Sequence, residues 1–439
     1  MLLNLTFWFL FITTPIIAFY LLRTVGEKIN QVSIINITII ALFVFSVLGT
    51  LPLFYFWDDY RVAIGVNDQA LVLKVLFYSC INILFFILGV VFVRKVVRLR
   101  PVPFVSSELI DLTKIQLLFL LLFFLLSIAF FCIYLSKINH IALFVVLTDG
   151  IKAAAIARSD MGNNFHGKYH WYRLGMYELA SLITFTTYII WLKNKRLKNL
   201  FSFLIVFSYS AFIATLATEK APLIWIIIGL FMAYFLTKKN GMISTYTSFY
   251  FILFIVIFLV CIYMFFMGSS NIRSALWSVF SRSFAGSVSP AYFYLQYFPE
   301  HHDYLLGKSF PNPGGILPYK PVEFTTEVMN WKFPELAKMN IVGSMPTVFW
   351  GESYANFGPW GIPIVAFIMG LILSVISYLV SKIELNPVST AFLVWLILNL
   401  KNLSVTGFSG YLYSFYIIVM TLITFIILFS KRKIRLRSL

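Results

Sequence analysis

The sequence is poor in charged residues, and acidic residues are the scarcer kind. Only 12% of its 439 residues are charged, whereas soluble domains carry about 25%. Together with 60% hydrophobic residues, this composition excludes an ordinary soluble enzyme and predicts an integral membrane protein with many spans. The 34 Lys and Arg outnumber the 17 Asp and Glu, which leaves a formal net charge of +17.

Cysteine is also scarce, and several common motifs are missing. Cys80, Cys132 and Cys261 all fall in apolar segments, so we expect neither a disulfide framework nor a metal site. The chain has no glycine-rich phosphate loop, no D-x-D motif and no internal repeat, and we expect no cofactor. Residues 1–22 lack a basic start and a small-residue cleavage site, and we interpret them as a retained span.

Apolar segments fill most of the chain, and about 20 apolar residues are enough to cross a bilayer as a helix. The sequence therefore predicts an all-α, polytopic membrane protein with about eleven spans in a single membrane domain, residues 1–439. The predicted spans are 2–22, 33–57, 71–93, 115–136, 173–192, 200–217, 221–237, 246–267, 360–381, 388–403 and 411–430.

The distribution of basic residues predicts the orientation. Lys and Arg concentrate in alternate connections, such as 94–100, 193–198 and the tail 431–437. Basic connections lie on the cytoplasmic side, so the N-terminus is expected outside and the C-terminus inside. The excess positive charge is explained by this bias, and it predicts no nucleic-acid partner.

Two connections on the predicted outer side are much longer than turns. Residues 137–172 form a first large outer loop, and residues 268–359 form a second. Within the first, Ile151 to Ala157 favours a helix that Asp149 would cap. Long loops in compact proteins usually carry function, so we expect the functional residues here.

Four outer-side cations are predicted to bind phosphate oxygens: Arg158, Arg273 and Arg282, with Lys220 as a helper. Several converging cations can hold a diphosphate without a metal, and arginine offers a planar, two-pronged donor. The alternative is that these side chains are solvated or extend to lipid headgroups.

The candidate general bases are Glu352, Glu323 and His166, because deprotonating a hydroxyl requires a carboxylate or an imidazole within hydrogen-bond reach. The run 301–303 (HHD) is more typical of a loop. Asp58 and Asp59 follow the second span and are either a secondary site or a polar stop at a helix end.

Two pieces of the second outer loop resemble a known family. LLGKSFPNPGGILPYKP, followed by GSMPTVFWGESYANFGPWGI, is similar to the oligosaccharide repeat unit polymerases, the Wzy-type O-antigen polymerases. The resemblance in organisation covers most of the chain, but the motif covers only about 305–361. Its second part is carried by Ser344, Pro346, Glu352, Tyr354, Asn356, Phe357, Gly358 and Gly361. Where relatives often carry an arginine, this chain has Lys220, which keeps the charge but loses the two-pronged geometry.

The resemblance implies a C-type (GT-C-like) membrane glycosyltransferase in the cell inner membrane, with no metal. Its donor and acceptor would be glycans on undecaprenyl diphosphate, joined on the outer face into an O-antigen or capsule-like polysaccharide, and a chain-length regulator is a possible partner. Two alternatives are an O-antigen ligase and a flippase or exporter of the lipid-linked unit. A flippase is expected to have related halves and charge inside the bundle, and the sequence has neither.

Overall fold

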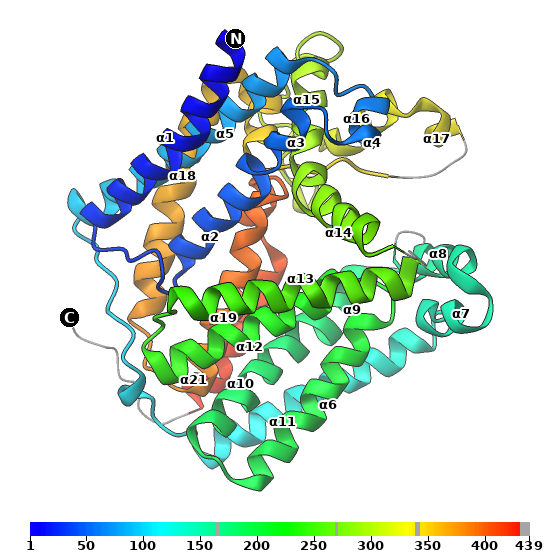
Figure 1. Cartoon of the computed structure of the whole chain (residues 1–439). Coiled ribbons are helices and arrows are strands. Elements are labelled where there is room, and N and C mark those ends of the chain that lie inside the picture. The colour runs from blue at the N-terminus through cyan, green and yellow to red at the C-terminus, as the bar shows by residue number, and fades with distance from the viewer. Residues whose placement is uncertain (163–164, 166, 268–270, 339–342, 431–439) are drawn as a thin grey trace. The chain divides into compact units, whose positions relative to one another are not determined.

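The computed structural model describes residues 1–162, 165, 167–267, 271–338 and 343–430 (Figure 1). Their regular secondary structure is helical throughout, with no strand among the elements of these residues. The predicted all-α class is therefore confirmed.

Nine helices in the described part of the chain are long and apolar enough to cross a membrane. They coincide with nine of the predicted spans, so the chain has the character of a polytopic membrane protein. The segments predicted at 173–192 and 388–403 contain shorter helices: α10 (Leu179–Lys193) has 15 residues and α19 (Pro387–Leu400) has 14. The count of eleven spans stays a prediction.

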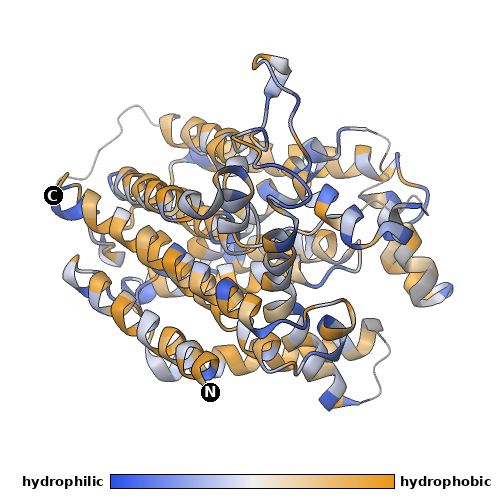
Figure 2. Cartoon of the chain, turned by 90° about the horizontal axis from the view of Figure 1, so that it is seen from above, coloured by the Kyte–Doolittle hydropathy of each residue, from blue (hydrophilic) through white to orange (hydrophobic). Residues whose placement is uncertain are grey.

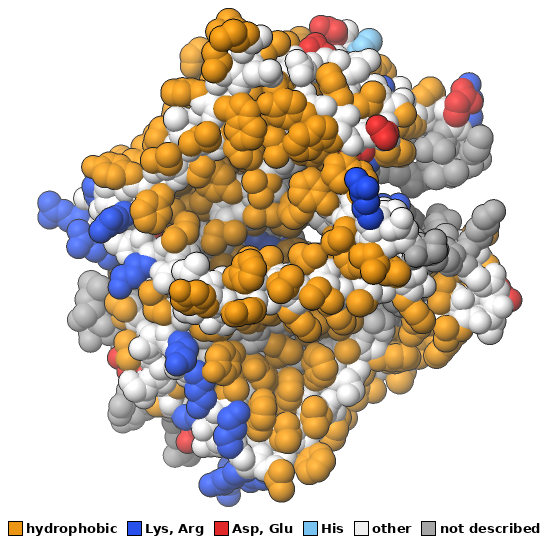
Figure 3. All heavy atoms as spheres, in the orientation of Figure 1, with side chains coloured by type: hydrophobic (Ala, Val, Ile, Leu, Met, Phe, Trp, Pro, Cys, Tyr) orange, Lys and Arg blue, Asp and Glu red, His pale blue; other side chains and the backbone are white. Residues whose placement is uncertain are grey.

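The surfaces of the long helices are hydrophobic, as lipid requires. Hydrophobic residues run along their lengths in Figure 2 and cover broad areas of the face drawn in Figure 3. In the candidate span Thr245–Phe265, only 11% of the most apolar window is buried within the protein. Such large apolar areas are typical of surfaces that contact lipid or another apolar partner.

The chain divides into two compact units. Unit 1 consists of Met1–Pro101, Trp277–Leu379 and Leu400–Ser414, and unit 2 of Val102–Leu276, Val380–Asn399 and Phe415–Leu439. The single membrane domain stays a prediction.

Unit 1 contains the candidate site. Its elements are α1 (Leu2–Thr24), α2 (Ile34–Leu42), η1 (Phe43–Val47), α3 (Thr50–Phe54), α4 (Asp59–Ala63), α5 (Gln69–Lys95), the end of α14 (Ile272–Phe280), η4 (Ser281–Ala285), α15 (Gly286–Tyr297), η5 (Pro313–Gly315), α16 (Phe324–Lys332), α17 (Pro334–Lys338), α18 (Trp350–Ser381), η6 (Lys401–Ser404) and α20 (Ser409–Leu412).

Helices α5 and α18 cross in backbone contact at a pair of glycines. A Cβ atom on Gly89 would lie 2.2 Å from the carbonyl oxygen of Phe367, and one on Gly370 would lie 2.0 Å from that of Phe86. Small residues let membrane helices approach this closely, and close packing is a main source of their association. The crossing fixes α18, which carries the candidate site at its N-terminal end. Helix α1 packs along α5 as well.

A buried ion pair lies at the C-terminal end of α5. The guanidinium group of Arg94 pairs with the carboxylate of Glu27, and the two side chains are 4% and 8% exposed. The Oε2 atom of Glu27 also accepts a hydrogen bond from Ser33, the residue that caps α2. The pair therefore links the connection after α1 to the end of α5.

Arg94→Met is expected to destabilise the protein by about 3–5 kcal/mol, because the substitution leaves the Glu27 carboxylate buried without its partner. Adding Glu27→Leu should restore most of the lost stability, since an apolar pair has no buried charge. Thermal or denaturant unfolding of the purified protein measures both effects. Lys95→Met, next in the chain and exposed, is the control. Equal stability of the single and double variants would contradict this role.

Unit 2 contains η2 (Ser106–Glu108), α6 (Lys114–Leu135), α7 (Ala142–Thr148), α8 (Gly150–Met161), α9 (Tyr169–Arg173), η3 (Leu174–Glu178), α10, α11 (Leu197–Thr215), α12 (Ala221–Lys239), α13 (Thr245–Met267), the start of α14, α19 and α21 (Phe415–Phe429). The predicted helix at 151–157 is confirmed as part of α8. Asp149 occupies its N-cap position but makes no side-chain cap; its carboxylate accepts from Thr148 instead.

Helices α6, α7 and α8 contribute to one hydrophobic cluster, which includes Tyr134, Ala142 and Met161. The hydroxyl group of Tyr134 on α6 donates to the carbonyl oxygen of Met161, 2.7 Å away, at the end of α8. Burial raises the pKa of Tyr169, whose ring lies near that of Tyr134. The described residues of the predicted first outer loop thus include the helices α7, α8 and α9.

Candidate functional site

The carboxylate of Glu352 is the centre of a hydrogen-bonded junction in unit 1. Glu352 lies in the first turn of α18 and is only 2% exposed. Its Oε1 atom accepts from the hydroxyl of Ser309 at 2.6 Å, and its Oε2 atom accepts from the backbone N–H of Ser409 at 2.9 Å. Three segments that are distant in sequence therefore meet at one side chain.

Asn356, one turn after Glu352, adds bonds to the same segments. Its side-chain oxygen accepts from the backbone N–H of Gly307 at 2.9 Å. Its amide nitrogen donates to the Ser309 hydroxyl and to the Glu352 carbonyl, both at 2.8 Å. The side chain uses both of its polar atoms, as a buried amide should.

Backbone bonds join the two pieces of sequence on which the family resemblance rests. The N–H of Leu305 donates to Ala355 and the N–H of Leu306 donates to Asn356, both at 3.0 Å. With the side-chain bonds above, segment 305–309 is attached along the first two turns of α18. The two motif pieces are thus one structural unit, here called the motif junction (residues 305–309, Glu352, Asn356 and Ser409).

A glycine separates the motif junction from the apolar part of α18. Gly358 has φ 65° and ψ −158°, a backbone conformation that residues with a side chain rarely adopt. Pro359 follows and lacks a backbone N–H, so the helical bonding is interrupted here. The segment leads into the predicted span 360–381, and the helix already begins at Trp350.

Aromatic side chains enclose the motif junction. Trp350 donates to Ser79 on α5 at 3.1 Å, Tyr354 donates to the carbonyl of Phe298 at 3.1 Å, and Tyr294 donates to that of Met345 at 2.7 Å. Burial, and secondly the charge of Glu352, raise the pKa of the Tyr294 hydroxyl well above its usual value. Tyr294 therefore remains protonated and a hydrogen-bond donor at neutral pH.

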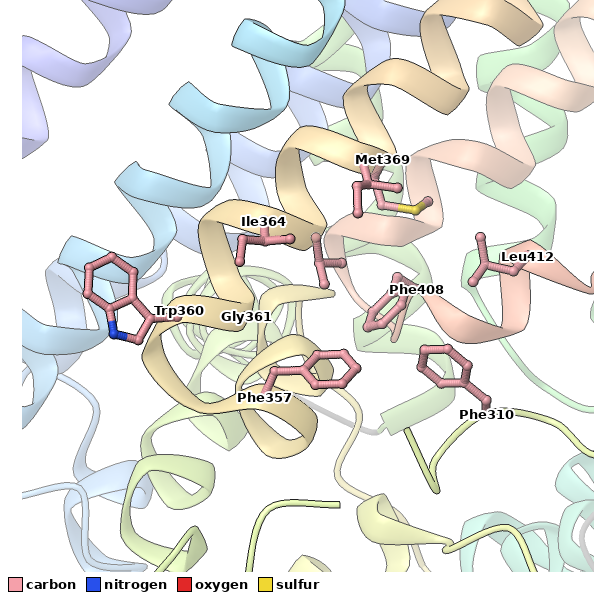
Figure 4. A pocket seen from close by; sticks show the side chains of 10 residues that line it. Phe310, Phe357, Trp360, Gly361, Ile364, Met369, Phe408 and Leu412 are labelled. Atoms are coloured by element: carbon pink, nitrogen blue, oxygen red, sulfur yellow. The ribbon is translucent and has the colours of Figure 1, made fainter. Parts of the chain in front are cut away.

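Beside the motif junction lies an apolar groove of about 480 Å³ (Figure 4). The rings of Phe310, Phe357 and Phe408 line one part of it, with Ile364 and Met369 from α18 above them in the view. The ring centroids of Phe310 and Phe408 are 5.4 Å apart. Phe310 directly follows Ser309, so the groove and the motif junction share a segment.

The predicted cations are distributed between the units. Arg158, in the last turn of α8, and Arg273, in α14, are exposed residues of unit 2. Lys220 is half-buried, with its ammonium group 3.6 Å from the centre of the Tyr263 ring. Arg282 is exposed and belongs to unit 1, in the π-helical turn η4 that continues α14. Their role in phosphate binding stays a prediction.

The candidate bases differ in burial and in hydrogen bonding. Glu352 is buried and accepts two hydrogen bonds, whereas Glu323 is exposed at the start of α16. His166 lies outside the described residues. These assignments also stay predictions, but the enclosure of Glu352 favours a positioning role for its carboxylate.

Asp58 serves as a helix cap. It is 2% exposed, accepts from the backbone N–H of Arg61 at 3.2 Å, and accepts from the Ser281 hydroxyl at 2.5 Å. Asp58 therefore caps the start of α4, and the role of the acid pair as a secondary site stays a prediction. The described residues contain no group of three or more His, Cys, Asp and Glu that could hold a metal ion.

Sequence reasoning missed Ser309 and Ser409. Ser309 stands inside the quoted motif, so its place there was the available signal. Ser409 comes from a Gly- and Ser-containing turn before the last span and carries no motif of its own.

Comparison of the chain with family models, with curated proteins and with solved structures found no match.

Proposed function

We propose that the protein is a GT-C-like membrane glycosyltransferase of the inner membrane that polymerises repeat units carried on undecaprenyl diphosphate. The observation that carries the proposal is the motif junction. Two pieces of sequence that together resemble the repeat unit polymerases are bonded to each other through Glu352, Asn356 and segment 305–309. A shared structural role for both pieces supports reading them as one motif.

In this proposal donor and acceptor are both lipid-linked, and the reaction takes place at the outer face of the membrane. A hydroxyl of the acceptor sugar attacks the anomeric carbon of the donor, whose bond to the diphosphate breaks. A base takes the hydroxyl proton. Cations that stabilise the charge developing on the departing diphosphate supply much of the catalysis. Arg158, Arg273, Arg282 and Lys220 are the groups proposed for this task.

The test of this function is deletion of the gene followed by inspection of cell-surface glycans. Loss of polymer ladders, with single lipid-linked units accumulating on the outer face, is the expected result. Units trapped on the inner face would instead identify a flippase. Free polymer that is not attached to its lipid core would identify a ligase. Unchanged ladders would overturn the proposal.

Arg282→Ala is expected to slow polymer formation about 10- to 100-fold, because a hydrogen bond to a charged group contributes about 1.5–3 kcal/mol. Arg282→Lys should recover part of the rate, since it keeps the charge without the two-pronged geometry. Ladder formation is measured at matched protein level. Arg100→Ala, an exposed arginine in a connection predicted to be cytoplasmic, is the control. Normal ladders in the Arg282→Ala variant would remove this residue from the site.

A further inference from the structure

Residues 308–322 form a compact loop, here called the 308–322 loop, whose two ends are hydrogen-bonded to each other. The backbone N–H of Val322 donates to the carbonyl oxygen of Lys308 at 2.8 Å, and the hydroxyl of Tyr319 donates to the carbonyl oxygen of Phe310 at 3.1 Å. Compact loops with closely spaced ends are called Ω-loops and are frequently functional. The first two residues of this loop belong to the motif junction.

The tip of the loop is a bonded turn that exposes two apolar side chains. Gly314 and Gly315 have φ of 73° and 68°, which reverses the direction of the chain. The Asn312 side chain spans this turn, because it accepts from the backbone N–H of Leu317 at 2.9 Å and donates to the Leu317 carbonyl at 3.0 Å. Ile316 is 83% exposed and Leu317 is 44% exposed. The turn therefore holds both apolar side chains at the surface.

The base of the loop lies at the level where α18 becomes apolar. The ring centroid of Phe310 is 6.5 Å from that of Phe357 and 5.4 Å from that of Phe408 (Figure 4). Phe357 precedes Gly358, at which the apolar part of this candidate membrane span begins. Trp360, in the same turn, is 79% exposed. Exposed tryptophan is typical of the membrane–water interface, so the base of the loop is expected at that interface.

The tip cannot extend far from this level, and the charge of the loop fits a lipid surface. Ile316 is six residues after Phe310, and a chain of that length reaches at most about 20 Å even when fully extended. Lys308 and Lys320 are exposed, and residues 308–322 include no Asp or Glu. Lysines near a bilayer are attracted to anionic headgroups, while apolar side chains beside them enter the acyl region.

We propose that the 308–322 loop is a membrane anchor, which inserts its two apolar tip residues into the lipid leaflet and places its two lysines among anionic headgroups. In the predicted orientation this is the outer leaflet. The anchor is independent of the proposed function, because it requires only that α18 spans the membrane. Through Ser309, which donates to Glu352, it attaches the motif junction to the bilayer surface.

The experiment places a nitroxide spin label on the tip of the full-length protein in lipid nanodiscs. Ile316→Cys is labelled in a background carrying Cys132→Ser and Cys261→Ser, because these two native cysteines are exposed and Cys80 is buried. Collisions of the label with oxygen, which concentrates in lipid, are compared with collisions with a water-soluble nickel complex. The oxygen-to-nickel ratio is expected to be several-fold higher at position 316 than at Glu335→Cys, an exposed control position on α17.

Three results decide whether the tip is in lipid. The high ratio supports the anchor. Equal ratios at positions 316 and 335 would place the tip in water and overturn it. A label protected from both reagents would show that protein, such as a second copy of the chain, covers the tip, and would also overturn it. Leu317→Cys is the second labelling position should the Ile316→Cys variant fail to fold.

The lysines are tested by changing the lipid charge. Nanodiscs that contain phosphatidylglycerol should give a higher oxygen-to-nickel ratio at position 316 than nanodiscs of phosphatidylcholine alone. Lys320→Gln should remove this increase, whereas Lys338→Gln, an exposed lysine outside the loop, should leave it unchanged. The same ratio in both lipids would overturn the contact of the lysines with anionic headgroups.

Discussion

Gly370→Leu is expected to prevent accumulation of folded protein. A Cβ atom at this position would lie 2.0 Å from the carbonyl oxygen of Phe86 and 3.2 Å from the Cα atom of Gly89. Both obstacles are backbone atoms of α5, so no rotation of a side chain relieves the clash. The two helices must separate, and the expected cost exceeds the roughly 1–3 kcal/mol of ordinary overpacking.

Gly370→Ala should already be severe, because the clash begins at Cβ. Gly89→Ala should act in the same way, since its Cβ would approach Phe367 at 2.2 Å. Size-exclusion profiles in detergent and unfolding temperatures measure the loss. The control is Gly410→Ala, where no other atom lies within 4 Å of the added methyl group. Wild-type stability in both helix variants would show that α5 and α18 do not cross as described.

Replacing Glu352 by Ala is expected to abolish polymer formation through loss of the motif junction. The buried Ser409 N–H would lose its acceptor, and an unsatisfied buried group costs about 1–3 kcal/mol. The half-buried Ser309 hydroxyl would lose its acceptor as well. Segment 305–309 would keep its bonds to Ala355, Asn356 and Val322 but lose the one to Glu352. The variant should therefore lower the unfolding temperature and weaken the attachment of this segment to α18.

Glu352→Gln separates positioning from proton transfer. The amide keeps the shape and one acceptor oxygen, so a positioning carboxylate predicts a milder loss of stability and polymer that falls in proportion to folded protein. A general base predicts a well-folded variant that makes no polymer. The exposed Glu300→Gln is the control for charge alone. A stable Glu352→Gln protein without activity would contradict the positioning role.

The long apolar helices were predictable because their signal is local. Length and hydropathy identify a span without knowledge of its neighbours, and all nine candidate spans coincide with predicted segments. The exceptions have physical reasons. Helix α18 begins before its apolar part, because residues 350–357 bury their polar side chains against other segments and not in lipid. The glycine at 358 marks the change between these two environments.

The motif junction was only half predictable. Glu352 and Asn356 could be selected from the motif, but the partner Ser409 comes from a distant turn and is chosen by long-range packing. The same holds for Asp58, whose partner Ser281 lies far along the chain. The candidate cations carry no comparable local pattern, since exposed arginines have the same sequence character whether or not they bind a ligand.

The contact between Gly89 and Gly370 has a consequence for biosynthesis. Helix α5 is made early and α18 late, so α5 waits on the order of tens of seconds for its partner at usual rates of translation. The whole of unit 1 shares this delay, because it is assembled from three separated stretches of chain. During that time Gly89 of α5 can contact only lipid or helices that are already inserted. A cell that lacks sufficient insertion capacity should therefore degrade the incomplete chain before residues 305–361 have been synthesised.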